Sequence, residues 1–144
     1  MFSMLDICRY SADCTMKTFF VVTGVIENNG RYLLLKKSPD DYNYPNKWSF
    51  CSGFVKEFES GEDTCLREIK EETGLDAQIV KTGKVMEIID KDKRWILMTF
   101  LCKAMSTDVK LDKENTEFAW VSLEDFERYD FVPGITKNLK TMGL

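Results

Sequence analysis

The sequence contains no histidine among its 144 residues. This absence excludes zinc sites built on histidine, Ser-His and Cys-His nucleophile systems, and imidazole as a general base. Acid-base chemistry in this protein must therefore use carboxylates, lysine, tyrosine or metal-bound water.

Paired cysteines and long apolar runs are also missing. No C-x-x-C pair occurs, so neither a disulfide framework nor a zinc knuckle is expected of the five cysteines, Cys8, Cys14, Cys51, Cys65 and Cys102. We expect reduced, mostly buried thiols in a cytoplasmic protein. The longest apolar run, Thr18 to Ile26, is about half of a membrane span, and residues 1–16 lack the pattern of a signal peptide. No membrane partner is expected.

The sequence has fewer basic than acidic residues. The 20 basic and 24 acidic residues give a net charge of -4, so no broad cationic surface is available for a nucleic-acid duplex. A small nucleotide is a more suitable partner, because a divalent metal ion supplies the positive charge that the protein lacks. The length and the 44% hydrophobic content predict one globular domain over residues 1–144.

Most of the chain has the patterns of β-strands. Strands are expected over residues 18–26, 31–35, 48–51, 77–89, 94–104 and 118–121, and residues 94–104 are apolar on both faces, as in a central strand. Residues 38–47 are rich in turn formers and form a loop. Short helical segments follow Ser122 and Pro133-Gly134. The helices are too few for a Rossmann unit. Residues 1–16 form either an edge strand or an arm of a homodimer.

One longer helix is predicted over residues 61–73. Ser60 caps its start and Gly74 ends it. We expect Cys65, Leu66, Ile69 and Thr73 on its apolar side, with three glutamates, Glu68, Glu71 and Glu72, on the other. These like charges repel one another, and Mg²⁺ would convert the repulsion into attraction, since it prefers carboxylate oxygens and shares them with substrate phosphates. An ordinary solvated helix face is the alternative.

The segment around this helix decides between the two interpretations. Residues 53–75 read GFVKEFESGEDTCLREIKEETGL, which resembles the Nudix hydrolase signature G-x5-E-x7-R-E-U-x-E-E-x-G-U, where U is aliphatic. All specified positions match, namely Gly53, Glu59, Arg67, Glu68, Ile69, Glu71, Glu72, Gly74 and Leu75. Ser52, Lys56 and Phe58 stand where many members have Gly, Glu and Gly, outside the strict motif.

The resemblance implies an α/β fold, a Nudix-type α/β/α sandwich with a central mixed β-sheet and a metal-binding loop-helix-loop. It implies Mg²⁺, with Mn²⁺ as the alternative cofactor, held by Glu68 and Glu72, with Glu71 in the inner or water-mediated shell and the carbonyl of Gly53 as a further ligand. Glu68 or Glu71 would activate the attacking water, and Arg67 would orient the carboxylates through Glu59. Glycine at position 53 lets the backbone approach the metal.

Substrate residues are marked less distinctly. Trp48 follows Asn46-Lys47 in a segment similar to one that borders the nucleotide pocket of MutT-like members, or it is a core or rim aromatic. Strand-end basic residues, Lys36 or Lys37 and Arg94, are candidates for binding phosphate, and Asp130 for binding a base edge. Either Glu114 or Glu117 supplies the extra acid that the family often places here. We assign Glu117 to the metal and Lys36, Trp48, Arg94 and Asp130 to the substrate.

The resemblance implies hydrolysis of a pyrophosphate bond in a nucleoside diphosphate linked to a group X. A MutT-like nucleoside triphosphate pyrophosphohydrolase is the first hypothesis. An ADP-ribose or nucleotide-sugar pyrophosphatase is the alternative within the enzyme class. A non-catalytic nucleotide-sensing module is the alternative of another class, disfavoured because all the catalytic carboxylates are kept. A structural protein with an accidental motif is the last.

Overall fold

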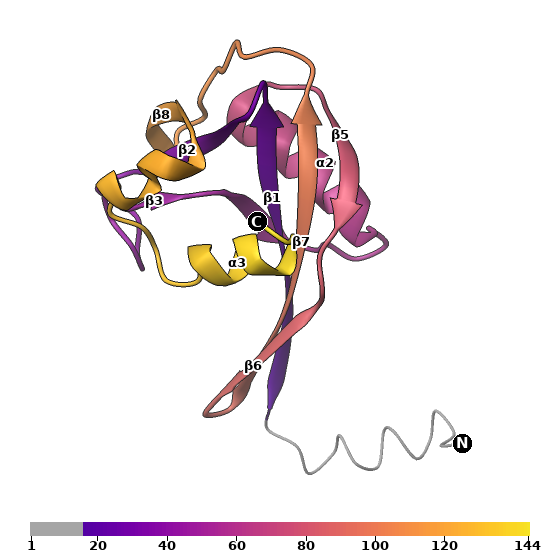
Figure 1. Ribbon diagram of the computed structural model, residues 1–144. Helices are drawn as coiled ribbons and strands as arrows, with labels where there is room; N and C mark the ends of the chain where they lie inside the picture. The colour runs from indigo at the N-terminus through magenta and orange to yellow at the C-terminus, as the bar shows by residue number, and fades with distance from the viewer. Residues whose placement is uncertain (1–15) are drawn as a thin grey trace.

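A mixed β-sheet of eight strands forms the frame of the molecule (Figure 1). The computed structural model describes residues 16–144, so the edge strand or dimer arm expected over residues 1–16 lies almost wholly outside the described residues. The strands are β1 (Lys17–Asn28), β2 (Arg31–Lys37), β3 (Trp48–Ser49), β4 (Cys51–Phe54), β5 (Ala77–Thr82), β6 (Met86–Asp90), β7 (Lys93–Ala104) and β8 (Asn115–Val121).

The long strands β1 and β7 run parallel along the centre of the sheet, in register from Lys17 opposite Lys93 to Glu27 opposite Lys103. On its other edge β1 pairs with β2 only at the hairpin end, and with β4 over Val21–Gly24. Beyond the hairpin end, β4 replaces β2 as the neighbour of β1. The sheet therefore divides between β2 and β4, and β4 carries Gly53. Strands β3 and β8 pair with β2, while β5 and β6 pair with β7.

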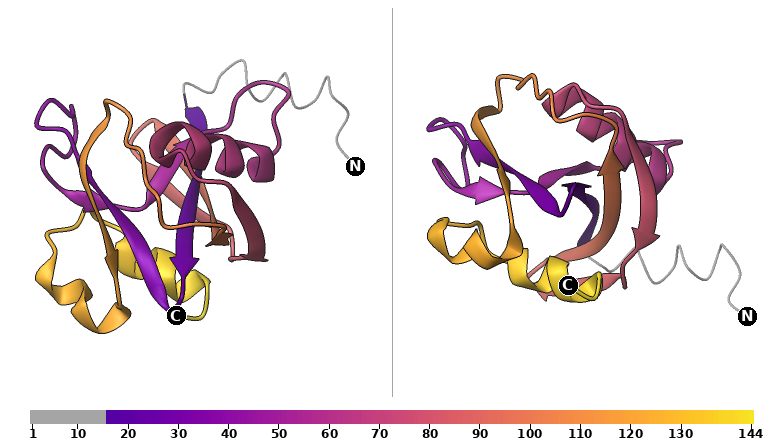
Figure 2. Two further views of the ribbon diagram at one scale, coloured as in Figure 1. Left: turned by 90° about the horizontal axis from the view of Figure 1, so that it is seen from above. Right: turned by 45° about the horizontal axis from the view of Figure 1, so that its top comes forward.

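Helices cover both faces of the sheet. The helix α2 (Gly61–Thr73) lies on one face, and the 3-10 helix η1 (Leu123–Arg128) and the helix α3 (Ile135–Thr141) lie on the other (Figures 1 and 2). Alternation along β2 divides the core between them: Leu33 and Leu35 pack under α2, whereas Tyr32 and Leu34 pack toward η1 and α3. This arrangement is the α/β/α sandwich that the resemblance implied.

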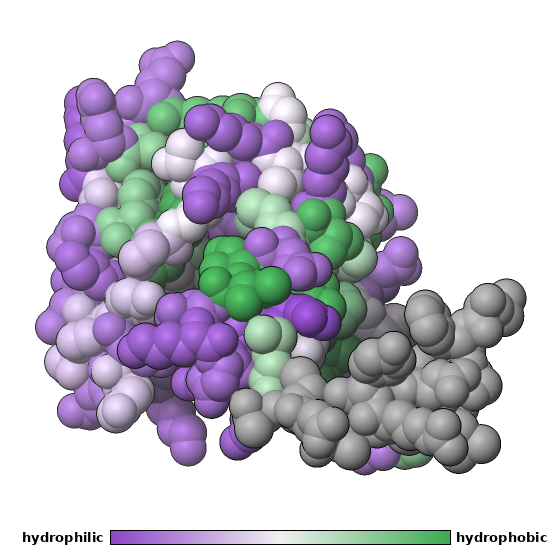
Figure 3. Space-filling model, turned by 90° about the horizontal axis from the view of Figure 1, so that it is seen from below, coloured by the Kyte–Doolittle hydropathy of each residue, from purple (hydrophilic) through white to green (hydrophobic). Residues whose placement is uncertain are grey.

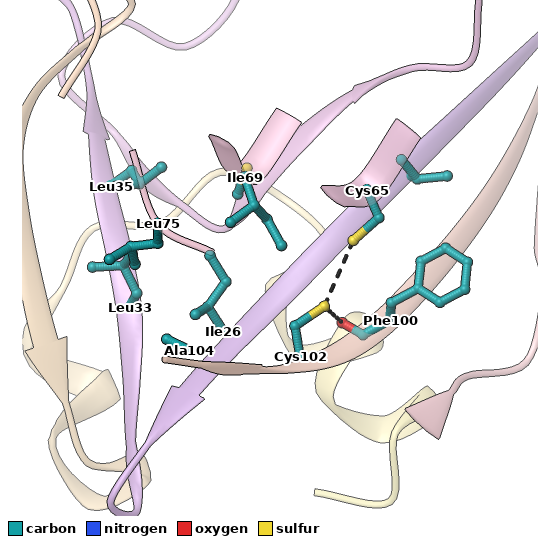
Figure 4. Close-up of a cluster of buried hydrophobic side chains, with 11 residues drawn as sticks. Ile26, Leu33, Leu35, Cys65, Ile69, Leu75, Phe100, Cys102 and Ala104 are labelled. Atoms are coloured by element: carbon teal, nitrogen blue, oxygen red, sulfur yellow. Dashed lines mark hydrogen bonds between the residues drawn. The ribbon is translucent and has the colours of Figure 1, made fainter. Parts of the chain in front are cut away.

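The buried cluster under α2 contains two facing thiols (Figure 4). The Sγ atoms of Cys65 and Cys102 are 3.7 Å apart, and both residues are free and buried, as is Cys51. The expectation of reduced, buried cysteines is met for these three, and Cys8 and Cys14 lie outside the described residues.

Two expected strands are divided. Residues 48–51 span β3 and the start of β4, with Phe50 between them. Residues 77–89 form β5 and β6, which are separated at residues 83–85 and pair with successive parts of β7. Gly83 lies at the division, where a Cβ atom would be 2.8 Å from Thr141 Oγ1 near the end of α3. The close passage of the C-terminal helix therefore coincides with the break. Among the described residues, no helix is long and apolar enough to cross a membrane.

The sides of α2 also differ from the expectation. Leu66 is 37% exposed, while Glu72 is buried with only 6% of its surface accessible. The side that faces the sheet carries Cys65, Ile69, Glu72 and Thr73, because residues at i, i+4, i+7 and i+8 share one side of a helix. Glu72 thus points toward the sheet, away from the solvent-facing side on which it was expected.

Candidate active site

The helix α2 is fixed at both ends by its own sequence. Ser60 Oγ accepts a hydrogen bond from the Asp63 backbone N–H at 3.1 Å, and Gly74 adopts a left-handed φ of 72° at the C-terminus. Along its length α2 crosses β1 at Gly24, where a Cβ atom would meet Cys65 Sγ at 3.1 Å. The close approach brings the helix carboxylates to the edge of β4.

Arg67 is the centre of the polar contacts on α2. Its guanidinium donates to both carboxylate oxygens of Glu59, at 2.7 and 3.0 Å, and to Glu68 at 2.8 Å and Glu71 at 3.2 Å. Glu59 also accepts from the Thr64 hydroxyl at 2.6 Å. Chiefly because of Arg67, the pKa of Glu59 is lowered to about 2. Arg67 therefore holds the glutamates in the way expected of a positioning residue.

Glu68 lies directly against the backbone of Gly53. A Cβ atom at position 53 would be 2.2 Å from Glu68 Cδ and 2.3 Å from its Oε1. Only glycine leaves room for this carboxylate beside β4. Burial raises the pKa of Glu68, although the contact with Arg67 opposes the shift. Glu71 differs, because its side chain is 54% exposed and contacts only Arg67 at 3.2 Å among the described ion pairs.

Glu72 is the most buried carboxylate on α2. The Cys51 thiol donates a hydrogen bond to its Oε2 atom. Burial is the main reason why the pKa of Glu72 rises to about 8, and the negative charges of Glu68, Glu114 and Asp112 raise it further. A carboxylate that is hard to ionise alone is a group whose charge a bound cation would stabilise.

Of the two candidates for the extra acid, Glu114 lies in the cavity with the helix carboxylates, and the expected Glu117 does not. Glu114 lines the same cavity as Glu68 and Glu72, and its charge raises the pKa of both. Glu117 is directed elsewhere: it lies opposite Lys36 in the β2–β8 register and pairs with it at 2.9 Å. A register shift at Lys36/Lys37 separates the two glutamates.

The cavity offers carboxylate and carbonyl oxygens, the ligands that a hard divalent cation prefers. Glu68, Glu72, Glu114 and the backbone of Gly53 line one cavity. The negative charge of Glu114 adds to the raised pKa of Glu68 and of Glu72, a repulsion that Mg²⁺ or Mn²⁺ would relieve. Within residues 16–144 no three such side chains converge closely enough to hold a metal. Glu68 instead contacts Arg67, and Glu72 contacts Cys51.

The cavity that contains these carboxylates has a volume of about 870 Å³, within the range usual for ligand sites. It extends across the sheet face between β4, β6 and the start of α3. Three lysines, Lys37, Lys56 and Lys137, are on its lining, and Lys37 lies 3.8 Å from Asp41, which lines the cavity too. At the α3 end the Thr99 hydroxyl donates to Asn138 Oδ1 at 3.2 Å, which leaves the Asn138 amide group as a donor.

Of the residues assigned to the substrate, none lines this cavity. Lys36 points to the η1 face, where it lies 6.0 Å from the centre of the Trp48 ring. Trp48 itself packs edge-on against Tyr129, as a rim aromatic would. Lys37, the alternative to Lys36, does line the cavity.

The other two assigned residues are engaged in ion pairs. Asp130 is paired with Lys47 at 2.6 Å, and Arg94 lies 3.8 Å from Glu87 of β6. The first ion pair connects the loop after η1 to Lys47, the residue before β3, and the second connects β6 to β7. The assignment of these side chains to the substrate remains a prediction, and the cavity itself points to other residues.

Sequence reasoning overlooked several residues of the cavity. Asn138, Phe54, Trp95 and Lys56 line it, yet none belongs to a specified position of the motif. Phe54 and Lys56 could have been found from the sequence, because they follow Gly53 by one and three positions. Asn138 and Trp95 had none, because only the fold brings α3 and β7 to the same site.

The comparisons with known proteins agree with this geometry. A family model described as NUDIX domain matches residues 17–141, which is most of the chain. The protein belongs to the Nudix family. This Nudix hydrolase is similar in sequence to a nucleoside triphosphatase, NudI, from Escherichia coli. The two are 31% identical over 140 aligned residues, which cover 90% of this chain and 99% of that protein.

Solved structures of Nudix proteins share the fold. A MutT protein from Methanosarcina mazei superposes with a TM-score of 0.73 at 28% identity, covering 85% of this chain and 90% of that one. A MutT Nudix hydrolase from Burkholderia pseudomallei gives a TM-score of 0.74 at 22% identity, covering 87% and 98%. At the latter identity the likeness concerns the fold alone.

Proposed function

We infer that this Nudix hydrolase cleaves nucleoside triphosphates to a nucleoside monophosphate and pyrophosphate, with Mg²⁺ or Mn²⁺ as cofactor. One observation carries the proposal: the acidic residues Glu68, Glu72 and Glu114 and the backbone of Gly53 line a single cavity together with three lysines, Lys37, Lys56 and Lys137. Acidic groups for a metal thus lie beside basic groups for phosphate. The name of the E. coli relative, a nucleoside triphosphatase, supports the choice of substrate.

The residues divide the work as follows. When bound, the divalent ion neutralises charge on the phosphates and makes a bound water more acidic. Of the two candidates for the general base, Glu68 and Glu71, we assign the proton transfer from the attacking water to Glu68, since Glu68 lines the cavity and Glu71 does not. Arg67 keeps Glu68 oriented, and Lys37 and Lys56 bind phosphate oxygens.

The setting of the enzyme follows from the same features. The three described cysteines are free and buried, which supports a reducing compartment such as the cytoplasm. A small nucleotide is the proposed partner, and the whole chain of 144 residues is proposed to act as a single domain. A homodimer through residues 1–16 remains a separate proposal.

A substrate panel tests the reaction. The purified protein would be incubated with Mg²⁺ and, separately, with NTPs, dNTPs, oxidised dNTPs, ADP-ribose, a nucleotide sugar and a dinucleoside polyphosphate, and the products identified by chromatography. We expect monophosphate and pyrophosphate from triphosphates at the highest kcat/KM. Preferred cleavage of ADP-ribose or a nucleotide sugar would replace the triphosphate assignment. Tight binding without any turnover would indicate a sensor.

A further inference from the structure

One end of the cavity differs in chemistry from the rest. Away from the lysines and Asn138, the lining becomes apolar and is supplied by Phe54 of β4, Met86 and Ile88 of β6, and Trp95 and Leu97 of β7. None of these side chains is suited to bind phosphate. The apolar end therefore calls for a ligand of another kind.

Three aromatic rings meet at this end. Phe19 and Trp95, paired in the register of β1 and β7, stack with centroids 4.6 Å apart and an interplanar angle of 22°. Phe54 lies edge-on to Phe19 at 6.2 Å and tilted to Trp95 at 6.4 Å. Phe54 and Trp95 line the cavity, whereas Phe19 does not line it and packs against both of these rings.

The rings lie within the reach of a nucleotide whose phosphate is at the carboxylates. Gly53 is opposite Val22, and Val22 is opposite Met98. Trp95 is three positions from Met98 along β7, which at the usual strand rise is roughly 10 Å. Phe54 is adjacent to Gly53 in sequence. A ring attached to the phosphates through a sugar spans a distance of this order.

The rings are also accessible from solvent. The contact between Thr99 and Asn138 fixes α3 over one part of the sheet face, but Phe54 remains 55% exposed in the part of the chain that the structure describes. In Figure 3 hydrophobic residues gather near the middle of the face seen from below, with hydrophilic residues around them. Exposed apolar surface of this kind, continuous with a polar cavity, is typical of a binding site.

Charged groups on the lining also bear on the ligand. Asp90, at the end of β6, is the acidic residue that follows the apolar residues of β6 on the lining. Without a cation its negative charge disfavours a phosphate beside it, whereas the carboxylates Glu68, Glu72 and Glu114 would meet phosphate through a divalent ion. An uncharged planar group meets no such repulsion, and it gains from contact with aromatic side chains.

We propose that Phe54 and Trp95 form a stacking surface for a nucleobase of the substrate. This inference rests on the proposed function, because the ring belongs to a nucleotide whose phosphate lies at Glu68 and Glu72. The base comes either from the nucleoside whose phosphate is attacked or from the group X. Stacking on aromatic side chains tolerates every base, so the surface determines affinity more than base identity.

Equilibrium binding tests the proposal without depending on turnover. Calorimetric titrations of AMP, GMP, CMP and UMP, which have no pyrophosphate bond to hydrolyse, into the protein with Mg²⁺ present would be compared with ribose 5-phosphate, which has no base. The variants are Trp95→Leu and Phe54→Leu, with Trp95→Phe as the conservative variant. Phe58→Leu is the matched control, because Phe58 is fully exposed and does not line the cavity. Circular dichroism and melting temperature establish that each variant is folded.

We expect Trp95→Leu and Phe54→Leu each to weaken nucleotide binding about tenfold or more. Binding of ribose 5-phosphate should be unchanged, Trp95→Phe should retain most of the affinity, and Phe58→Leu should match the wild type. Equal nucleotide affinities in all variants, or no nucleotide binding by the wild type, would overturn the proposal. Stacking without turnover of any substrate would instead contradict the proposed function alone.

Steady-state kinetics determine which part of the substrate, the attacked nucleoside or the group X, supplies the stacked base. If the base belongs to the attacked nucleoside, Trp95→Leu raises the KM for nucleoside triphosphates while leaving their kcat nearly unchanged. If it belongs to X, the KM rises for a dinucleoside polyphosphate only. An unchanged KM for both classes of substrate in Trp95→Leu and Phe54→Leu would overturn the stacking role.

Discussion

The backbone of Gly53 and the side chain of Glu68 are in such close contact that a Cβ atom at position 53 would lie 2.2 Å from Glu68 Cδ. The contact joins β4 to α2 at the place where the family motif begins. It explains why glycine is required here in structural terms: the space that a side chain would take is filled by a carboxylate of the site.

The first prediction follows from this contact. Gly53→Ala forces Glu68 out of place, and we expect kcat/KM to fall about 100-fold, since small displacements at a reacting centre have effects of this size. Gly61→Ala is the matched control, because a Cβ atom there would be an ordinary 3.4 Å from Met98 Sδ. Steady-state kinetics on both variants would check the prediction, and equal activities would contradict it.

The ion pair between Arg67 and Glu59 predicts a sensitivity to acid. The pKa of Glu59 is lowered from 4.5 to about 2, chiefly by Arg67. The folded state therefore holds fewer protons than the unfolded state in this range. The stabilisation is present above pH 4.5 and is lost as the pH falls toward 2.

In Arg67→Gln this dependence should weaken. Melting temperatures of the wild type and the variant, measured from pH 6 down to pH 2.5, should differ most at pH 6 and converge as the pH falls. A difference that stays constant over this range would show that Arg67 does not control the ionisation of Glu59.

The raised pKa of Glu72 predicts that metal affinity and stability depend on pH, with the stability changing in the opposite direction to that from Glu59. The pKa of Glu72 is raised to about 8, mainly by burial, so the metal-free folded protein carries a proton on Glu72 at pH 7. A cation must displace this proton. We therefore expect the apparent affinity for Mg²⁺ or Mn²⁺ to rise with pH and to level off above about pH 8.

Titration calorimetry in buffers of different ionisation enthalpy would count the protons released. Without metal, the stability contributed by protonated Glu72 is complete below pH 4.5 and decreases as the pH rises through about 8. Both dependences should disappear in Glu72→Gln. Metal affinity that is flat between pH 6 and 9 in the wild type would contradict the assignment of Glu72 as a ligand.

A fourth prediction separates two neighbouring acids. Glu114 lines the cavity, whereas Glu117 pairs with Lys36 and does not line it. We expect Glu114→Gln to lower kcat/KM about tenfold or more, as loss of a group around a metal site usually does, and Glu117→Gln to retain activity. Kinetics of the two variants side by side test this, and the reverse order of activities would restore Glu117 to the site.

Helix α2 could be predicted from the sequence to the residue, because its signals are local. Ser60 and Gly74 are chain neighbours of the helix that they end, and the motif spacing from Gly53 to Leu75 is a property of the chain alone. The left-handed φ of 64° at Phe58 also agrees with the glycine that many family members have there. Family and reaction class depend on this segment.

The substrate residues could not be predicted in the same way, because they depend on strand pairing. Lys37 and Glu114, rather than Lys36 and Glu117, line the cavity, and a register shift in the pairing of β2 with β8 lies between Lys36 and Lys37. Asn138 and Trp95 enter the site only through the packing of α3 and the pairing of β1 with β7. Spacing along the chain carries no information about such contacts.

The central claim is that the carboxylates of α2 perform metal-dependent hydrolysis in the cavity. Its most direct test is turnover of a nucleoside triphosphate in ¹⁸O-labelled water with Mg²⁺, for the wild type, Glu68→Gln and Glu72→Gln. The account predicts monophosphate and pyrophosphate with one ¹⁸O atom between them, and loss of turnover in both variants and after chelation of the metal. Turnover that persists unchanged in both variants, or without divalent metal, would contradict it.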